Sequence, residues 1–178
     1  MLALVLGGAA SGKSEYAEQL AVSLSSQRYY IATMQVDDAE SERRICRHRQ
    51  MRAGKGFHTV ERALDLAGLD LYCPGAAALL ECASTLLGNE LYLTGGAGVN
   101  APDAIMAGIE RLLAEGLDVV VVSNDVFSAG APCTPEMRTY ITALGRLNCL
   151  IAAAADCVVE VCCGLPIYHK RKAEDFGV

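Results

Sequence analysis

The residues from Gly7 to Ser14 have the types and the spacing of a phosphate-binding loop. They match the pattern G-x-x-x-x-G-K-[ST] at every specified position. This pattern places glycine where main-chain N–H groups turn inward around a phosphate, lysine near the outer phosphates and a hydroxyl beside Mg²⁺. We expect the whole loop to bind the phosphates of a nucleoside triphosphate: Gly7, Gly8, Ala9, Ala10, Ser11, Gly12, Lys13 and Ser14.

Two side chains of this loop carry its chemistry. Lys13 is expected to be an exposed loop residue that neutralises phosphate charge during phosphoryl transfer, and we assign it as catalytic. The Ser14 hydroxyl is expected to bind Mg²⁺. The apolar run from Leu2 to Leu6 predicts a strand before the loop, and residues 14–20 predict a helix whose positive N-terminal end faces the same phosphates. A glycine-rich turn without a ligand is the alternative, and the flanking strand and helix favour the phosphate site.

Two acidic residues follow predicted buried strands. Residues 76–80 form an unbroken apolar run that ends in Glu81, and residues 118–123 are followed by Asn124 and Asp125. In open α/β sheets, ligands bind at the carboxyl ends of the strands. Glu81 is therefore our first candidate for the acid that organises Mg²⁺, and Asp125 is the alternative. Either carboxylate could instead cap neighbouring main-chain N–H groups.

A strongly charged segment from Ala39 to Arg52 is predicted to form a helix that contains His48. The segment has almost no apolar residues, so its basic face needs an anionic partner or water. Neutral imidazole can attack a phosphorus atom and then leave, as nucleotidyl transfer in two steps requires. The nearby arginines would keep His48 neutral and offer charge to a triphosphate: Arg44, Arg47, Arg49 and Arg52. A solvated histidine on a charged helix is the alternative interpretation.

The remaining segments alternate between strand and helix patterns. Residues 28–33 predict a second strand, and residues 157–162 predict the last one. Helices are predicted over residues 84–92, 102–115 and 135–155. This alternation predicts a parallel sheet that is covered on both faces.

The chain is predicted to form a single α/β domain over residues 1–178. Gly164-Leu165-Pro166 is expected to end the last strand, and the basic residues 169–172 then predict a solvated tail, with residues 170–178 flexible. With 178 residues, of which 52% are apolar, the chain is long enough for one well-buried core.

The composition restricts the partners of the protein. A net charge of −6 provides no sequence-wide positive field for nucleic acid, so we expect a small-molecule substrate. The eight cysteines contain no C-x-x-C pair, which favours a reduced, cytoplasmic compartment over a metal site or a disulfide framework. No signal peptide is predicted, because the N-terminus lacks a basic region and runs straight into the phosphate loop. No membrane span is predicted, because Asp156 and Glu160 interrupt the most apolar C-terminal stretch.

Motifs along nearly the whole chain occur in a characteristic order. After the phosphate loop they are Tyr30-Ile31-Ala32-Thr33, Arg44-Ile45-x-x-His48-Arg49, Thr59-x-Glu61, Leu80-Glu81-Cys82, Ser123-Asn124-Asp125, Pro135-Glu136 and Gly145-x-x-Asn148. In these motifs the chain resembles the bifunctional adenosylcobinamide kinase/adenosylcobinamide-phosphate guanylyltransferase family. The phosphate loop is shared with many unrelated enzymes, whereas R-I-x-x-H-R soon after Y-I-A-T is more specific. The resemblance implies a P-loop NTPase (RecA-like) three-layer fold with a mainly parallel central sheet, and a homo-oligomer, usually a trimer.

The resemblance also implies roles for individual residues. His48 would be the histidine that becomes guanylylated, and Phe57 would pack against guanine, with His58 as a loop residue. Further nucleotide contacts would come from these positions: Ala32, Thr33, Met34, Arg49, Gln50, Met51, Arg52, Glu61 and Glu81. Two features depart from the family pattern. Ala10 stands where arginine is often found, and residues 127–134 replace a glycine-rich stretch.

The function implied by the resemblance has two steps. The enzyme would phosphorylate adenosylcobinamide with ATP or GTP, and would then transfer GMP from GTP to adenosylcobinamide phosphate through a guanylyl-histidine, which releases pyrophosphate. Two alternatives remain open from the sequence. The chain could be a kinase alone, with His48 vestigial, or a nucleotide-switched regulatory module whose basic segment, residues 43–52, docks an acidic partner.

Overall fold

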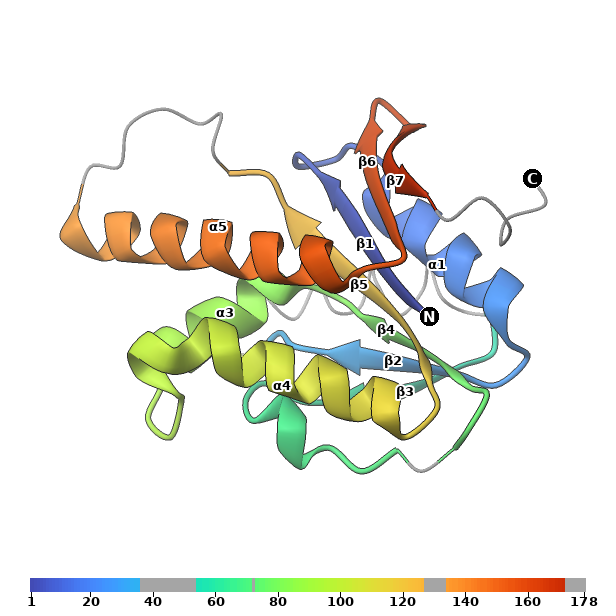
Figure 1. The fold of residues 1–178 in the computed structure, drawn as a ribbon, viewed down its shortest axis with the longest axis horizontal. Coiled ribbons are helices and arrows are strands. Elements are labelled where there is room, and N and C mark those ends of the chain that lie inside the picture. Colours follow the sequence, from blue (N-terminus) through green and yellow to red (C-terminus); the bar gives the residue numbers. More distant parts are fainter. Residues whose placement is uncertain (36–53, 72, 127–133, 172–178) are drawn as a thin grey trace.

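The fold is a seven-stranded sheet with helices on both faces (Figure 1). We describe it from a computed structural model, which defines residues 1–35, 54–71, 73–126 and 134–171. The strands lie in the order β3-β2-β4-β5-β1-β6-β7. Their bounds are β1 Leu2–Gly7, β2 Arg28–Ala32, β3 Phe57–Glu61, β4 Ala77–Leu80, β5 Asp118–Asn124, β6 Cys157–Cys162 and β7 Leu165–Arg171. All neighbouring pairs are parallel except β6 and β7, which are antiparallel.

The helices divide between the two faces of the sheet. Their bounds are α1 Lys13–Leu24, α3 Ala83–Tyr92, α4 Ala101–Ala114 and α5 Pro135–Ala154, with short 3₁₀ turns η1 Leu66–Gly68 and η2 Gly98–Asn100. Successive side chains of a strand point to opposite faces. Leu2 and Leu4 of β1 therefore join the core cluster that contains α3, α4 and α5, whereas Ala3 and Val5 join the cluster that contains α1. The predicted three-layer P-loop fold with a mainly parallel sheet is confirmed.

The register of the central strands determines which loops lie side by side. Strand β1 lies between β5 and β6, and Gly7 at its end pairs with Asn124 at the end of β5. On the other side of β5, Leu80 of β4 pairs with Val121. The carboxyl ends of β1 to β5 therefore form one edge of the sheet, which we call the carboxyl edge.

Two strands were not predicted from the sequence. Strand β3 carries the polar sequence Phe-His-Thr-Val-Glu at one edge of the sheet, and no residue of it is fully buried. Strand β7 is exposed along its whole length. The prediction of a tail from residue 170 is wrong at Lys170 and Arg171, which pair with β6, and residues 172–178 lie outside the described part. Basic side chains are compatible with an edge strand, because that strand has one unpaired side in water.

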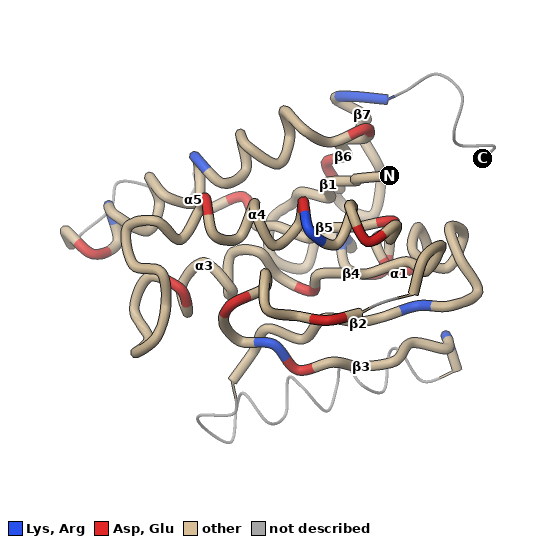
Figure 2. The backbone as a smooth tube through the Cα atoms, turned by 60° about the horizontal axis from the view of Figure 1, so that its bottom comes forward, with Lys and Arg blue, Asp and Glu red and all other residues tan. Residues whose placement is uncertain are grey.

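Other predicted elements are present with small shifts at their ends, and one falls outside the described residues. The strands at 28–33, 76–80, 118–123 and 157–162 appear as β2, β4, β5 and β6, and the three predicted helices as α3, α4 and α5. The predicted helix over residues 39–52 lies outside the described part of the chain. Among the described residues, no helix has the length and apolar character needed to cross a membrane. Figure 2 shows the described Lys and Arg residues dispersed over several elements.

The turn between β6 and β7 has two residues, Cys163 and Gly164, and both have a positive φ, of 51° and 80°. We call it the β6–β7 turn. A two-residue turn of this hand matches the right-handed twist of the strands that it joins, and its first position favours asparagine. Cysteine carries a Cβ atom that makes the left-handed conformation unfavourable. The chain therefore accepts strain at Cys163.

Replacing Cys163 should change stability in a direction that depends on the new residue. Cys163→Asn should raise the free energy of unfolding by about 0.5–1 kcal/mol, because Asn-Gly suits this turn, whereas Cys163→Val should lower it by a similar amount. Denaturant unfolding of the two variants at equal m value measures the difference. Equal stability of the two variants would show that the turn conformation at residue 163 carries no such strain.

Candidate active site

The phosphate loop curls tightly between the end of β1 and the start of α1. Gly12 has φ +93°, and a Cβ atom on it would lie 3.2 Å from Gly164 Cα. A Cβ atom on Gly7 would lie 2.5 Å from Ser11 Oγ and 2.7 Å from the Val161 carbonyl oxygen. Gly7 therefore leaves no room for a side chain, because it contacts both the loop and the β6–β7 hairpin, and Gly12 combines a tight contact with a positive φ that favours glycine.

The β6–β7 turn holds the outside of the loop. The Gly164 N–H donates a hydrogen bond of 2.8 Å to the Ser11 carbonyl oxygen. On the other side, the Asp125 N–H donates to the Gly7 carbonyl oxygen at 3.2 Å. The loop is thus fixed by the chain segments that follow its two neighbouring strands, β6 and β5.

The loop and the start of α1 carry polar groups that suit an anion. Gly12 occupies the N-cap of α1, where no side chain caps the helix, so the first N–H groups of α1 have no side-chain acceptor there. The Ser11 hydroxyl is buried and has no hydrogen-bond partner among the residues that the structure describes. A helix N-terminus attracts phosphate, and a buried unsatisfied polar atom in a native structure calls for a ligand or water. This geometry fits the phosphates of a nucleotide.

Lys13 is the first residue of α1, and its environment differs from the prediction. It is 9% exposed, so the expectation of an exposed loop lysine is wrong. Its Nζ donates to the Gly8 carbonyl oxygen at 2.9 Å, which folds the side chain back over the loop. Burial lowers the pKa of Lys13, and the nearby Cys82 acts in the opposite direction. A bound phosphate would offer this cation a charged partner at the same place.

The acidic candidates gather on the carboxyl edge. Glu61 ends β3 in register with Ala32 of β2, Glu81 directly follows β4, and Asp125 directly follows β5. Glu81 is half-buried, whereas Glu61 and Asp125 are exposed. Ser14, in the first turn of α1, is half-buried. The structure therefore brings the phosphate loop and all three carboxylates to one edge of the sheet.

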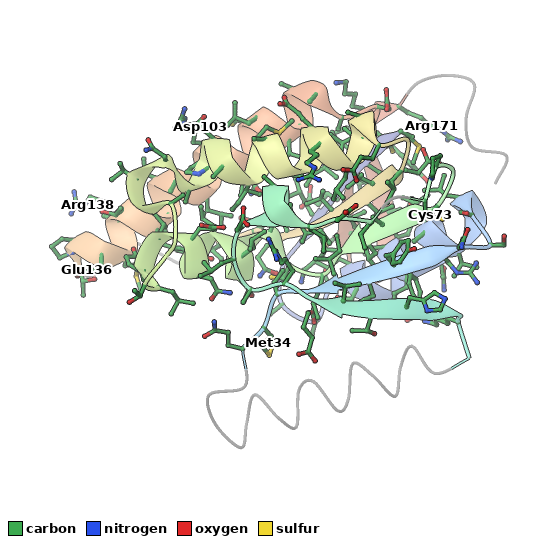
Figure 3. The ribbon with its side chains drawn as sticks, turned by 90° about the horizontal axis from the view of Figure 1, so that it is seen from below. Met34, Cys73, Asp103, Glu136, Arg138 and Arg171 are labelled. Atoms are coloured by element: carbon green, nitrogen blue, oxygen red, sulfur yellow. The ribbon has the colours of Figure 1, made fainter. Side chains whose placement is uncertain are left out.

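The predicted nucleotide turn after β2 lies on the same edge. Thr33 is fully buried and Met34 is half-buried. Figure 3 shows Met34 just beyond the end of β2, and Cys73, which precedes β4, toward the other end of β2. Ala32, Thr33 and Met34 thus lie on the same carboxyl edge as the phosphate loop, with β4 and β5 between β2 and β1.

Phe57 and His58 lie at the other end of β3. Phe57 pairs with Arg28 at the start of β2, four residues before Glu61, which corresponds to about 13 Å along a strand. Its ring packs edge-on against Tyr30 at a centroid distance of 6.0 Å. Phe57 therefore lies at the end of β3 away from the carboxyl edge, and its packing against guanine stays a prediction. His58 is a strand residue rather than a loop residue.

A polar network at this edge was not predicted. Cys82 is the N-cap of α3, and its Sγ accepts hydrogen bonds from the Thr85 N–H at 3.4 Å and the Thr85 hydroxyl at 3.1 Å. Asn124 Nδ2 donates to the Ser84 hydroxyl oxygen at 2.6 Å, and the Tyr140 hydroxyl donates to the Ser84 carbonyl oxygen at 3.1 Å. These contacts connect the ends of β4 and β5 with α3 and α5. Sequence offered a partial signal, since Cys82 and Asn124 belong to the recognised motifs.

Some predicted site residues lie outside the described part of the chain. These are His48, Arg49, Gln50, Met51 and Arg52. The described chain ends before them at Gln35, on the carboxyl edge, and resumes at Gly54, shortly before β3.

Comparison with known proteins agrees with the site geometry. Residues 3–168 match the family described as "Cobinamide kinase / cobinamide phosphate guanyltransferase". The chain is 39% identical to "Bifunctional adenosylcobalamin biosynthesis protein CobU" of Escherichia coli (strain K12), over 96% of this chain and 100% of that protein. The Salmonella typhimurium protein of the same name is 37% identical with the same coverage. "Bifunctional adenosylcobalamin biosynthesis protein CobP" of Pseudomonas aeruginosa is 32% identical over 92% of this chain and 94% of that protein. The chain therefore belongs to the cobinamide kinase / cobinamide phosphate guanyltransferase family.

Proposed function

We propose that this protein catalyses both reactions in its family's description, with the phosphates of the nucleotide held in the loop from Gly7 to Ser14. The observation that carries the proposal is the combination of an uncapped α1 N-terminus and the Lys13 side chain folded back over the same loop. The substrates would be adenosylcobinamide and its phosphate. We also propose a cytoplasmic homo-oligomer. In the described residues every cysteine is a free thiol, which supports a reduced compartment.

In the kinase step, the chain would position the triphosphate and neutralise its charge. The loop N–H groups and Lys13 would hold the β- and γ-phosphates of ATP or GTP, and the corrinoid hydroxyl would attack the γ-phosphorus in line. The oxygens of Ser14 and of Glu81 or Asp125 are suitable ligands for Mg²⁺. When bound, Mg²⁺ would neutralise charge on the phosphate oxygens. Glu81 stays our first choice for the Mg²⁺ ligand, because it is half-buried and directly follows β4.

In the guanylyl transfer step, His48 would act as the nucleophile. One ring nitrogen attacks the α-phosphorus of GTP, a P–N bond forms, and the P–O bond to pyrophosphate breaks. An oxygen of adenosylcobinamide phosphate then attacks the same phosphorus, and the P–N bond breaks to give adenosylcobinamide-GDP and free His48. Ala32, Thr33, Met34, Glu61 and the residues from Arg49 to Arg52 would contact the nucleotide. Only this step needs a side-chain nucleophile.

Within the proposed function, the first prediction concerns Lys13. Lys13→Met should weaken triphosphate binding by about 100-fold or more, because a buried cation on the phosphates is lost. The protein without nucleotide should be at least as stable as the wild type. Burial lowers the pKa of Lys13, so the unfolded chain binds that proton more tightly, and the wild type should gain stability relative to Lys13→Met as pH rises toward 10.5. Titration calorimetry and thermal unfolding between neutral pH and pH 10.5 measure both effects.

Arg146→Met is the matched control for this prediction, because Arg146 is 54% exposed on α5 and pairs with Asp103. It removes one positive charge away from the loop and should leave affinity unchanged. Wild-type affinity in Lys13→Met would exclude the loop as the phosphate site.

The second prediction separates the two acids. The amide variant of the residue that organises Mg²⁺, Glu81→Gln or Asp125→Asn, should lose about 100-fold in turnover and require more Mg²⁺ for half-maximal rate. The other variant should behave like Glu110→Gln, an exposed control on α4. Kinase rates measured against Mg²⁺ concentration distinguish them. Small and equal losses in both would mean that neither carboxylate holds the metal.

The third prediction concerns His48. GTP labelled at the α-phosphate should attach GMP covalently to the wild type, in a linkage that acid breaks and alkali does not, as expected for a phosphoramidate. His48→Ala should abolish labelling and guanylyl transfer but retain kinase turnover, because the kinase step uses the substrate hydroxyl directly. Mass spectrometry of the labelled peptide identifies the residue.

Two results would change the assignment. Labelling of His48→Ala at the wild-type rate would place the nucleophile elsewhere. Kinase turnover without labelling of any sample would leave a kinase alone.

A further inference from the structure

Asn89 of α3 uses both donors of its side chain on main-chain oxygens from two other segments. Its Nδ2 donates to the Thr33 carbonyl oxygen at 2.8 Å and to the Ala63 carbonyl oxygen at 3.0 Å. Thr33 follows β2 and Ala63 follows β3, so both acceptors lie just past the carboxyl edge. A primary amide has two N–H donors, and two main-chain carbonyl oxygens accept from both donors of Asn89. None of the proposed steps assigns a role to Asn89.

The carbonyl of Thr33 is the first one beyond the sheet ladder. The two preceding carbonyls are paired with neighbouring strand ends: Ile31 accepts from the Glu81 N–H at 3.1 Å, and Ala32 accepts from the Arg62 N–H at 2.8 Å. The next carbonyl, of Thr33, has no strand beside it and accepts from Asn89 instead. The hydrogen bond from Asn89 therefore holds the main chain in place at Thr33, one residue past the end of β2.

A second contact holds Thr33 from the start of the same helix. Its hydroxyl donates to the Cys82 carbonyl oxygen at 3.3 Å, and the residue is fully buried. Cys82 directly follows Glu81, and Ala63 lies two residues after Glu61. Helix α3 thus connects the segments that carry three of the proposed nucleotide or metal contacts: the turn from Ala32 to Met34, Glu61 and Glu81.

We propose that Asn89 is a positioning residue of the nucleotide site, and that it sets the places of the Ala32–Met34 turn and of Glu61 relative to Glu81. The proposal rests on the proposed function, since it assumes that these residues contact nucleotide. An amide side chain suits the task because it donates two directed hydrogen bonds without adding charge beside phosphates. Small displacements of positioning groups have large effects on binding and rate.

The test measures nucleotide affinity and folding separately in three variants. Asn89→Leu keeps the size of the side chain and removes both donors, and Asn89→Ser leaves room for water at both carbonyls. Ile109→Val removes one methylene group from a fully buried position on α4 and serves as the control for lost stability. The probes are β,γ-imido ATP and α,β-methylene GTP with Mg²⁺, which prevent phosphoryl and guanylyl transfer respectively. Calorimetry gives Kd, and thermal unfolding gives Tm.

We expect Asn89→Leu to weaken binding of the better probe by about tenfold, and to raise KM more than it lowers kcat. Ile109→Val should lower Tm about as much as Asn89→Leu does, but its Kd should stay within about twofold of the wild type. Wild-type Kd in folded Asn89→Leu would overturn the inference. A loss of affinity in Ile109→Val equal to that in Asn89→Leu would also overturn it, because binding would then follow stability.

Two further variants, Asn89→Ser and Lys13→Met, separate a failure of this inference from a failure to fold and from a failure of the phosphate site. If Asn89→Leu does not fold, Asn89→Ser is judged by the same criterion. Lys13→Met is measured beside them: lost binding in Lys13→Met with wild-type binding in the Asn89 variants overturns only the role of Asn89. Wild-type binding in Lys13→Met overturns the phosphate site on which the inference rests.

Discussion

The close packing of the phosphate loop against the β6–β7 hairpin is the constraint on which the site depends. A Cβ atom on Gly7 would lie 2.7 Å from the Val161 carbonyl oxygen, and one on Gly12 would lie 3.2 Å from Gly164 Cα. The loop therefore has little room for side chains at Gly7 and Gly12 on the side that faces the hairpin. The Lys13 side chain folds back over this loop and donates to the Gly8 carbonyl oxygen.

The parallel sheet adds the second half of the site. The register places Gly7 beside Asn124 and Ala32 beside Glu61. Asp125, which follows Asn124, and Glu61 therefore lie on the same carboxyl edge although they come from separate strands. The network of Cys82, Ser84 and Asn124, together with the contacts of Asn89, then ties the segments beyond the strands to α3. The strand order therefore determines which segments lie near one another, and side-chain hydrogen bonds fix the position of each segment beyond its strand.

Local sequence patterns predicted the central strands of the sheet and missed its two outer strands, β3 and β7. Continuous apolar runs such as residues 119–122 identify buried parallel strands, and the loop from Gly7 to Ser14 has a pattern of its own. Strands β3 and β7 lie at the edges, where side chains are polar or exposed and give no buried pattern. The burial of Lys13 and the role of Asn89 depend on contacts with distant segments. Asn89 bonds to Thr33, 56 residues away, which no local pattern encodes.

The contact between the β6–β7 turn and the phosphate loop has a consequence for synthesis on the ribosome. Strand β1 is made first, yet its neighbours β5 and β6 and the turn at Gly164 come more than a hundred residues later. Chains with such distant pairings pay their loop-closure entropy late and fold slowly. The nascent chain therefore carries a complete phosphate-loop sequence that is not yet held in its final shape, and nucleotide binding becomes a property of the finished protein.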